Sequence, residues 1–223
     1  MANFVRQLDP LKAFREFVTE YMKGIYTSIP AHIVSFDPET QLAQIEIGIK
    51  RVEIDGTDHV LPPIIDCPVL FSGGDEFVIE HQIDAGCEGW ALFSQRCIDG
   101  WIQTGGNAIN PITRFFDIQD ACFIPGFRSN PKAVKGFSNN GVKIRNKAGN
   151  HLVWLKNDGT IELNNSKGHI KIEPNGTVII NGMVFNTDQT ITSVNEATIG
   201  GIAFTPHVHG GVYSGSSNTG GPK

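Results

Sequence analysis

Near the start of the chain, apolar residues recur every three or four positions, which is the period of a helix. They form one stripe between residues 9 and 27, and the charged residues lie elsewhere on the helical wheel. Asp9 suits the N-cap and Pro10 suits the first helical position. We therefore expect one strong helix over 9–27, closed off by Pro30. Its apolar stripe, which can pack on its own domain or on a neighbouring copy, comprises Leu11, Phe14, Val18, Tyr21, Met22 and Ile25.

Between residues 31 and 127 the pattern changes to short apolar or alternating runs with turn residues between them. Five or so antiparallel strands of this kind, in a turn-rich region, are typical of a small closed barrel such as an OB-fold. A loop begins at Gly105, and residues 117–126 finish the domain. The runs that we expect as strands are 32–36, 41–47, 52–54, 64–71, 77–79 and 89–94.

From Val134 onward, short alternating strands follow one another with a glycine-containing turn after each. The turn glycines are Gly149, Gly159, Gly168 and Gly176, and their regular spacing indicates a short-period β repeat. The expected strands of the repeat are 141–145, 151–156, 160–164, 169–173 and 177–181. The stretch between Ser193 and Phe204 is poorly patterned.

This repeat has too little of its own material to form a core. Each strand has a narrow apolar edge, such as Ile161 with Leu163, and no helix or second sheet follows to cover it. A single-chain β-helix is one solution, but with coils of about twenty residues the segment makes barely three. Three identical chains wound into a triangular prism are the other solution. We favour the trimer, because the apolar rows of the three chains then meet on the axis.

Composition narrows the class of protein. The charged fraction is 18% and the net charge is −5, which argues against a broad electrostatic grip on nucleic acid. None of the four cysteines is paired at metal-ligand spacing, so we expect reduced, partly buried thiols. The sequence has no basic-then-apolar signal segment and no apolar run near the ~20 residues of a membrane span. We expect a soluble protein made in a cytoplasm.

Candidate metal ligands lie near the C-terminus, at His207 and His209. In an extended segment both imidazoles point to the same side. Two imidazoles are only part of a site, because zinc needs four ligands and octahedral ions need six. No other histidine or cysteine motif lies nearby to complete the set. The pair is therefore either a solvated polar tail or one third of a site that three chains complete with six imidazoles.

The C-terminal segment has a family resemblance. It reads Thr205-Pro-His-Val-His-Gly-Gly-Val, followed by Ser214-Gly-Ser-Ser-Asn-Thr-Gly-Gly-Pro-Lys. This apex, placed after a barrel and a β repeat, resembles the central spike (membrane-piercing) proteins of contractile-tailed bacteriophages, and residues 93–101 are also similar to that family. The resemblance implies a mainly β fold with these parts in order: an N-terminal helical segment 1–28, an OB-fold domain 29–130, an intertwined trimeric β-helix 131–200 and a metal-bound apex 201–223.

The resemblance also implies a function. His207 and His209 would be the metal ligands, holding one octahedral Fe ion per trimer, or another octahedral divalent metal. The protein would be a non-enzymatic homotrimer at the distal end of the tail baseplate in the virion, assembled in the host cytoplasm. It would dock on baseplate hub proteins and puncture the host outer membrane on sheath contraction. Ser214 and Thr205 are candidates to accept hydrogen bonds from the imidazole N–H groups that do not face the metal.

The remaining polar residues support enzymatic chemistry weakly. Ser94 has no nucleophile-elbow frame, and Asp75, Glu76 and Glu80 form a loose acidic patch that suits a solvated face better than acid–base work. A rival function is a metal-dependent β-barrel enzyme in which His207 and His209 bind a metal together with a third ligand from elsewhere in the chain. A receptor- or glycan-binding tail tip and the spike of a secretion system are two further rivals. The singly spaced histidines, expected at the surface or in turns, are His32, His59, His81, His151 and His169.

Overall fold

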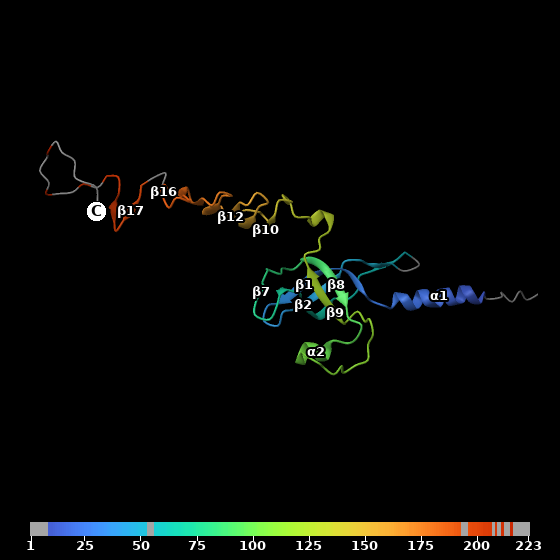
Figure 1. Ribbon diagram of the computed structural model, residues 1–223. Coiled ribbons are helices and arrows are strands. Elements are labelled where there is room, and N and C mark those ends of the chain that lie inside the picture. The colour runs from blue at the N-terminus through green and yellow to red at the C-terminus, as the bar shows by residue number, and fades with distance from the viewer. Residues whose placement is uncertain are drawn as a thin grey trace, which may run out of the picture. The chain divides into compact units, whose positions relative to one another are not determined.

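The computed structural model describes residues 9–52, 56–192 and 196–206, together with Val208, Gly211 and Gly215 (Figure 1). The chain divides into two compact units, Met1–Ala133 and Val134–Lys223. No helix in the described part of the chain is long and apolar enough to cross a membrane.

The N-terminal helix is present but shorter than predicted. α1 spans Pro10–Lys23, and the Asp9 carboxylate accepts a hydrogen bond from the Leu11 amide, as its N-cap role requires. The helix ends at Gly24, and Pro30 already lies inside the first strand. The prediction that Pro30 closes the helix was therefore wrong. None of the side chains of α1 is buried.

The first unit is built on a five-stranded antiparallel sheet with the strand order β5-β2-β1-β8-β9. A bridge between Val69 and Phe123 links the two edges of this sheet, and the Leu70 amide donates to the Phe123 carbonyl. The sheet therefore curls on itself, as expected for an OB-fold. The strands are β1 (Ser28–Asp37), β2 (Leu42–Ile47), β5 (Ile64–Pro68), β8 (Glu88–Phe93) and β9 (Ala121–Pro125).

The core of the first unit lies inside this curl. Alternate residues along the strands point inward, so that Ile33, Ile45 and Phe123 are almost completely buried. Gly89 is required on β8, because a Cβ there would lie 2.3 Å from the Ile124 carbonyl oxygen and 2.4 Å from the Phe123 ring. Two hairpins complete the unit's strands: β3 (Arg51–Val52) with β4 (Asp58–His59), and β6 (Ser72–Gly73) with β7 (Val78–Ile79).

Five elements of the first unit were not predicted, namely β4, β6, β9, a short helix and a 3-10 turn. The closing segment 117–126 contains β9, an edge strand of the sheet. The short helix α2 (Asp99–Thr104) follows β8, and a 3-10 turn η1 (Asn130–Lys132) lies near the end of the unit. A helix of six residues shows less than two turns of periodicity, so the apolar pattern cannot reveal it.

The second unit is a seven-stranded antiparallel ladder in which every strand pairs with its sequence neighbour. All five predicted strands are present close to their expected bounds, and two further strands extend the ladder. A small hairpin of β17 (Thr198–Ile199) and β18 (Ile202–Ala203) follows. The ladder consists of β10 (Val142–Arg145), β11 (Leu152–Leu155), β12 (Ile161–Asn164), β13 (His169–Ile172), β14 (Val178–Ile180), β15 (Met183–Phe185) and β16 (Ile191–Thr192).

The turns along one side of the ladder repeat the same local chemistry. In each, the side chain of an Asp or Asn accepts a hydrogen bond from the amide of the threonine two residues later: Asp158 from Thr160, Asn175 from Thr177 and Asp188 from Thr190. The residue between has a positive φ and is glycine twice, but Gln189 in the third turn. These turns fix where each strand begins, and so hold the register of the ladder.

Candidate functional site

The predicted metal ligands His207 and His209 lie outside the described residues, as does Ser214. The structure describes the segment immediately before them. Thr205 follows the β17–β18 hairpin, and its amide donates a hydrogen bond of 2.9 Å to the Glu196 carboxylate. Hydrogen bonds from Thr205 also lower the pKa of Glu196. The chain is thus anchored two residues before His207.

One face of the ladder is entirely apolar. Directly paired residues of antiparallel strands share a face, and so do alternate residues of one strand. One row across the ladder starts with Val142, Leu155 and Ile161, and a second starts with Ile144, Val153 and Leu163. We call the whole set the apolar face: Val142, Ile144, Val153, Leu155, Ile161, Leu163, Ile170, Ile172, Val178, Ile180, Met183, Phe185 and Ile191.

The opposite face of the ladder carries polar side chains on its first strands. Its side chains are less exposed to solvent than those of the apolar face. Lys143 lies 3.3 Å above the centre of the Trp154 ring. Lys156 also lies over this ring and makes a 2.6 Å ion pair with Glu162, and the side chains of the pair are each only 18% exposed. On the apolar face Ile144 is 66% exposed. This is the reverse of the burial expected for a free-standing protein, because charged side chains are covered while aliphatic ones meet solvent.

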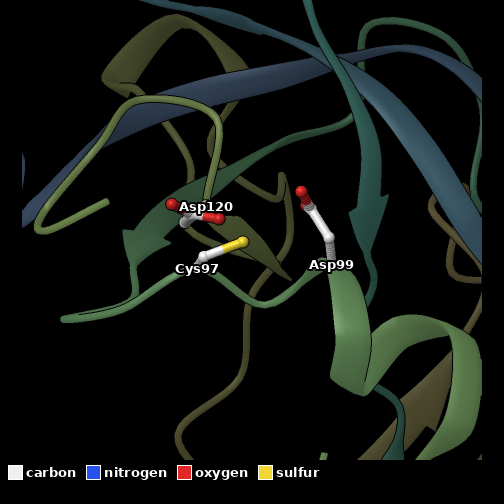
Figure 2. Close-up of side chains that lie close together, drawn as sticks. All are labelled: Cys97, Asp99 and Asp120. Carbon is white, nitrogen blue, oxygen red and sulfur yellow. The ribbon is translucent and has the colours of Figure 1, made fainter. Parts of the chain in front are cut away.

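A cluster of potential metal ligands lies in the first unit, where Cys97, Asp99 and Asp120 approach one another (Figure 2). Asp120 is completely buried, Cys97 is buried between β8 and α2, and Asp99 is the first residue of α2. Cys97 and Asp99 belong to the segment 93–101 that carried part of the family resemblance. The spacing of residues in the sequence did not predict that Asp120 lies near Cys97 and Asp99.

The Arg114 guanidinium occupies the centre of this cluster. Its Nη2 atom donates to Asp120 Oδ1 at 2.8 Å, to Asp99 at 3.0 Å and to Cys97 Sγ at 3.2 Å, and its Nε atom donates to Asp120 Oδ2. The hydrogen bonds to Asp120, together with the charges of both carboxylates, raise the pKa of Arg114 further above its usual value. The Ile98 amide also donates to Asp120. The cluster is therefore a satisfied ion-pair network that joins the α2 segment to the barrel, and a cation already fills the place of a metal.

The remaining candidates keep ordinary environments. Asp75, Glu76 and Glu80 are exposed, which agrees with a solvated acidic face. Ser94 Oγ accepts a hydrogen bond from the Arg96 amide, and no described histidine is bonded to it. The His81 ring packs at a tilt of 50° against Phe71, with ring centroids 5.0 Å apart. Both residues line a hollow of about 530 Å³ that sequence patterns did not indicate. All four cysteines are free thiols, and two of them, Cys67 and Cys97, are buried.

A curled five-stranded barrel followed by a ladder of very short strands defines a mainly β protein whose repeat segment cannot bury its own apolar face. Residues 29–126 match the family model for the phage protein Gp138 N-terminal domain, and residues 201–223 match the GpV Apex motif. Both of these domains are characteristic of phage baseplate spike proteins, which agrees with the resemblance found in the sequence. Both are structural domains, and neither is a known enzyme family. No curated protein matches the chain.

Proposed function

We propose that the chain is the homotrimeric spike at the distal end of a contractile phage tail, where it punctures the host outer membrane when the sheath contracts. The observation that carries this proposal is the apolar face of the ladder. Nine of its thirteen side chains are exposed in one chain, although each is worth about 1.5–3 kcal/mol when fully buried. Three ladders around a threefold axis bury all three faces against one another and leave the polar faces outward.

A prism of this kind suits a mechanical role. Each ladder strand pairs with the next along the chain, so the backbone is hydrogen-bonded from β10 to β16. Winding three such ladders together adds a dry core along the axis, and close-packed interiors have low compressibility. The energy for penetration comes from the sheath, and the spike needs stiffness rather than turnover. The protein therefore acts without catalysis.

His207 and His209 are the proposed metal ligands at the point. Three copies supply six imidazoles, a donor set that suits iron or another octahedral divalent ion and disfavours tetrahedral zinc. The match of residues 201–223 to an apex motif supports this assignment. When bound, the ion would cross-link the three chain ends and keep them from fraying. The anchoring of Thr205 by Glu196 limits the freedom of the chain just before the ligands.

The partners follow from this position. The barrel would dock on baseplate hub proteins, and the point would meet the outer membrane transiently. The net charge of −5 disfavours nucleic acid as a partner. Assembly would take place in the host cytoplasm, in keeping with four free thiols and no disulfide among the described cysteines.

Light scattering combined with elemental analysis of the purified chain tests the proposal. We expect the mass of three chains and one iron, or one other octahedral ion, per three chains. The double substitution His207→Ala with His209→Ala should remove the metal and leave the trimer, because the ladder holds the chains together. His169→Ala, on the polar face of the ladder, is the matched control and should keep the metal. A monomer overturns the spike, and one metal per monomer supports the enzyme instead.

Virions that carry the double variant test the mechanical part. They should adsorb and contract normally, while delivery of DNA into cells becomes slower because the point frays. Equal delivery by the double variant and the His169→Ala control would contradict a role of the metal in penetration.

A further inference from the structure

The apolar residues of α1 follow the spacing of a coiled coil. Leu11, Phe14, Val18 and Tyr21 are separated by three, four and three positions, so they occupy successive a and d sites of a heptad. Phe17 and Met22 fall on the flanking g and e sites and widen the apolar stripe. The outer face has the opposite character, with ion pairs between Lys12 and Glu16 and between Glu20 and Lys23.

No described residue of the chain covers this stripe. Leu11 is 68% exposed, Phe14 is 64% exposed, and Val18 is only partly buried. The charged residues of the outer face form ion pairs with one another within the helix. A fourteen-residue helix is marginal in water by itself, so α1 requires a partner for its apolar stripe.

The position of α1 in the chain favours two further copies of itself as that partner. Only residues 24–27 separate the end of α1 from β1, the central strand of the barrel sheet. In a threefold assembly the three helices therefore leave three symmetry-related barrels from equivalent points and run in the same sense along the threefold axis. A short tether of this length gives an effective concentration on the order of millimolar, which compensates for the small number of heptads.

We propose that the three copies of α1 form a parallel three-helix coiled coil at the N-terminal end of the trimer. Leu11, Phe14, Val18 and Tyr21 form its central layers. At the flanks, Phe17 of one copy lies against Met22 of the next, because a g site faces the e site five residues later in the neighbouring helix. The inference rests on the proposed trimer, and it assigns the helix a role that the β-helix and the apex do not supply.

Disulfide trapping in the full-length chain tests this arrangement. Val18→Cys places three thiols in one central layer, whereas Thr19→Cys places them on the outer face of the same helix turn. After mild oxidation, non-reducing gels should show covalent dimers for Val18→Cys, one disulfide per trimer, and monomers for Thr19→Cys. The native cysteines are present in both variants, so their contribution cancels.

A second measurement does not depend on disulfide geometry. Val18→Asp should lower the helical circular dichroism signal of the full chain while light scattering still gives three chains, and Thr19→Asp should leave both unchanged. A trimer in which Val18→Cys cross-links no more than Thr19→Cys, and in which Val18→Asp keeps its helical signal, overturns the coiled coil, leaves the spike standing and indicates a different protein as the partner of α1. A monomeric wild-type chain overturns the proposed function itself.

Discussion

At the scale of single residues, the most demanding feature of the first unit is the buried carboxylate of Asp120. It accepts hydrogen bonds from two nitrogens of Arg114 and from the Ile98 amide, and it is fully inaccessible to solvent. The pair was invisible in the sequence. Asp120 lies in a loop-like segment, and Cys97 and Asp99, which bind the same arginine, come near it only through the turn from β8 into α2. Nothing in residue spacing encodes such a meeting.

Replacing Arg114 with methionine should destabilise the first unit by about 3 kcal/mol, because it leaves the Asp120 charge buried without its partner. Urea denaturation of the chain truncated after Ala133, which lacks Trp154, followed by the fluorescence of Trp90 and Trp101, measures the loss. Lys50→Met is the matched control, since Lys50 pairs with Asp58 on the exposed surface and the midpoint should stay within error. Equal midpoints for the two variants would show that the buried network contributes nothing to stability.

The buried thiol of Cys67 should make the folded state less stable at alkaline pH. Burial raises the pKa of this thiol well above its usual value of 9.0, so the folded state holds the proton that the unfolded state releases. The resulting stability is present below pH about 9 and is lost above it, at up to about 1.4 kcal/mol per pH unit. Urea midpoints at pH 8 and pH 10 should differ less for Cys67→Ala than for the wild type. An identical pH slope in the two proteins contradicts this assignment.

At the scale of elements, prediction from the sequence succeeded where the pattern is local. The strands between Val142 and Ile180 alternate with period two, and turn residues separate them, so both their number and their faces follow from the sequence. β9 and α2 were missed because one is an edge strand in a turn-rich segment and the other is less than two turns long. The ligands His207 and His209 stay a prediction, since they lie outside the described residues.

The apolar face gives a direct test of the trimer. Leu163→Asp places a carboxylate in the middle of that face, between Val153 and Ile170. In a threefold prism three such charges would meet on the axis, so we expect the mass to fall from three chains to one. Asn164→Asp puts the same charge on the neighbouring residue and the opposite face, where an aspartate can still accept the Ser166 hydrogen bond.

Sedimentation velocity distinguishes the two variants. The Asn164→Asp chain should sediment like the wild-type trimer and the Leu163→Asp chain like a monomer or an aggregate of no fixed size. If Leu163→Asp also sediments as a trimer, the apolar face is not at the centre of the assembly, and another surface must hold the three chains together.

At the scale of the whole molecule, the two units obtain their stability in different ways. The buried hydrophobic residues of the described chain all belong to the first unit, and the only buried residue described in the second unit is Thr160. A barrel with its own core can fold as one chain, whereas a ladder whose apolar face is exposed needs other copies. The stability of the second unit should therefore depend on protein concentration and that of the first should not.

Calorimetry of the full chain and of a chain truncated after Ala133 tests this difference. The truncated chain should be monomeric and unfold in one transition whose midpoint is independent of concentration, because α1 is too short to assemble without the tether of the ladder. The full chain should show an additional transition that moves to higher temperature with increasing concentration, since unfolding separates three chains. A concentration-independent second transition would mean that one ladder is stable alone, and the physical reason for a trimer would be lost.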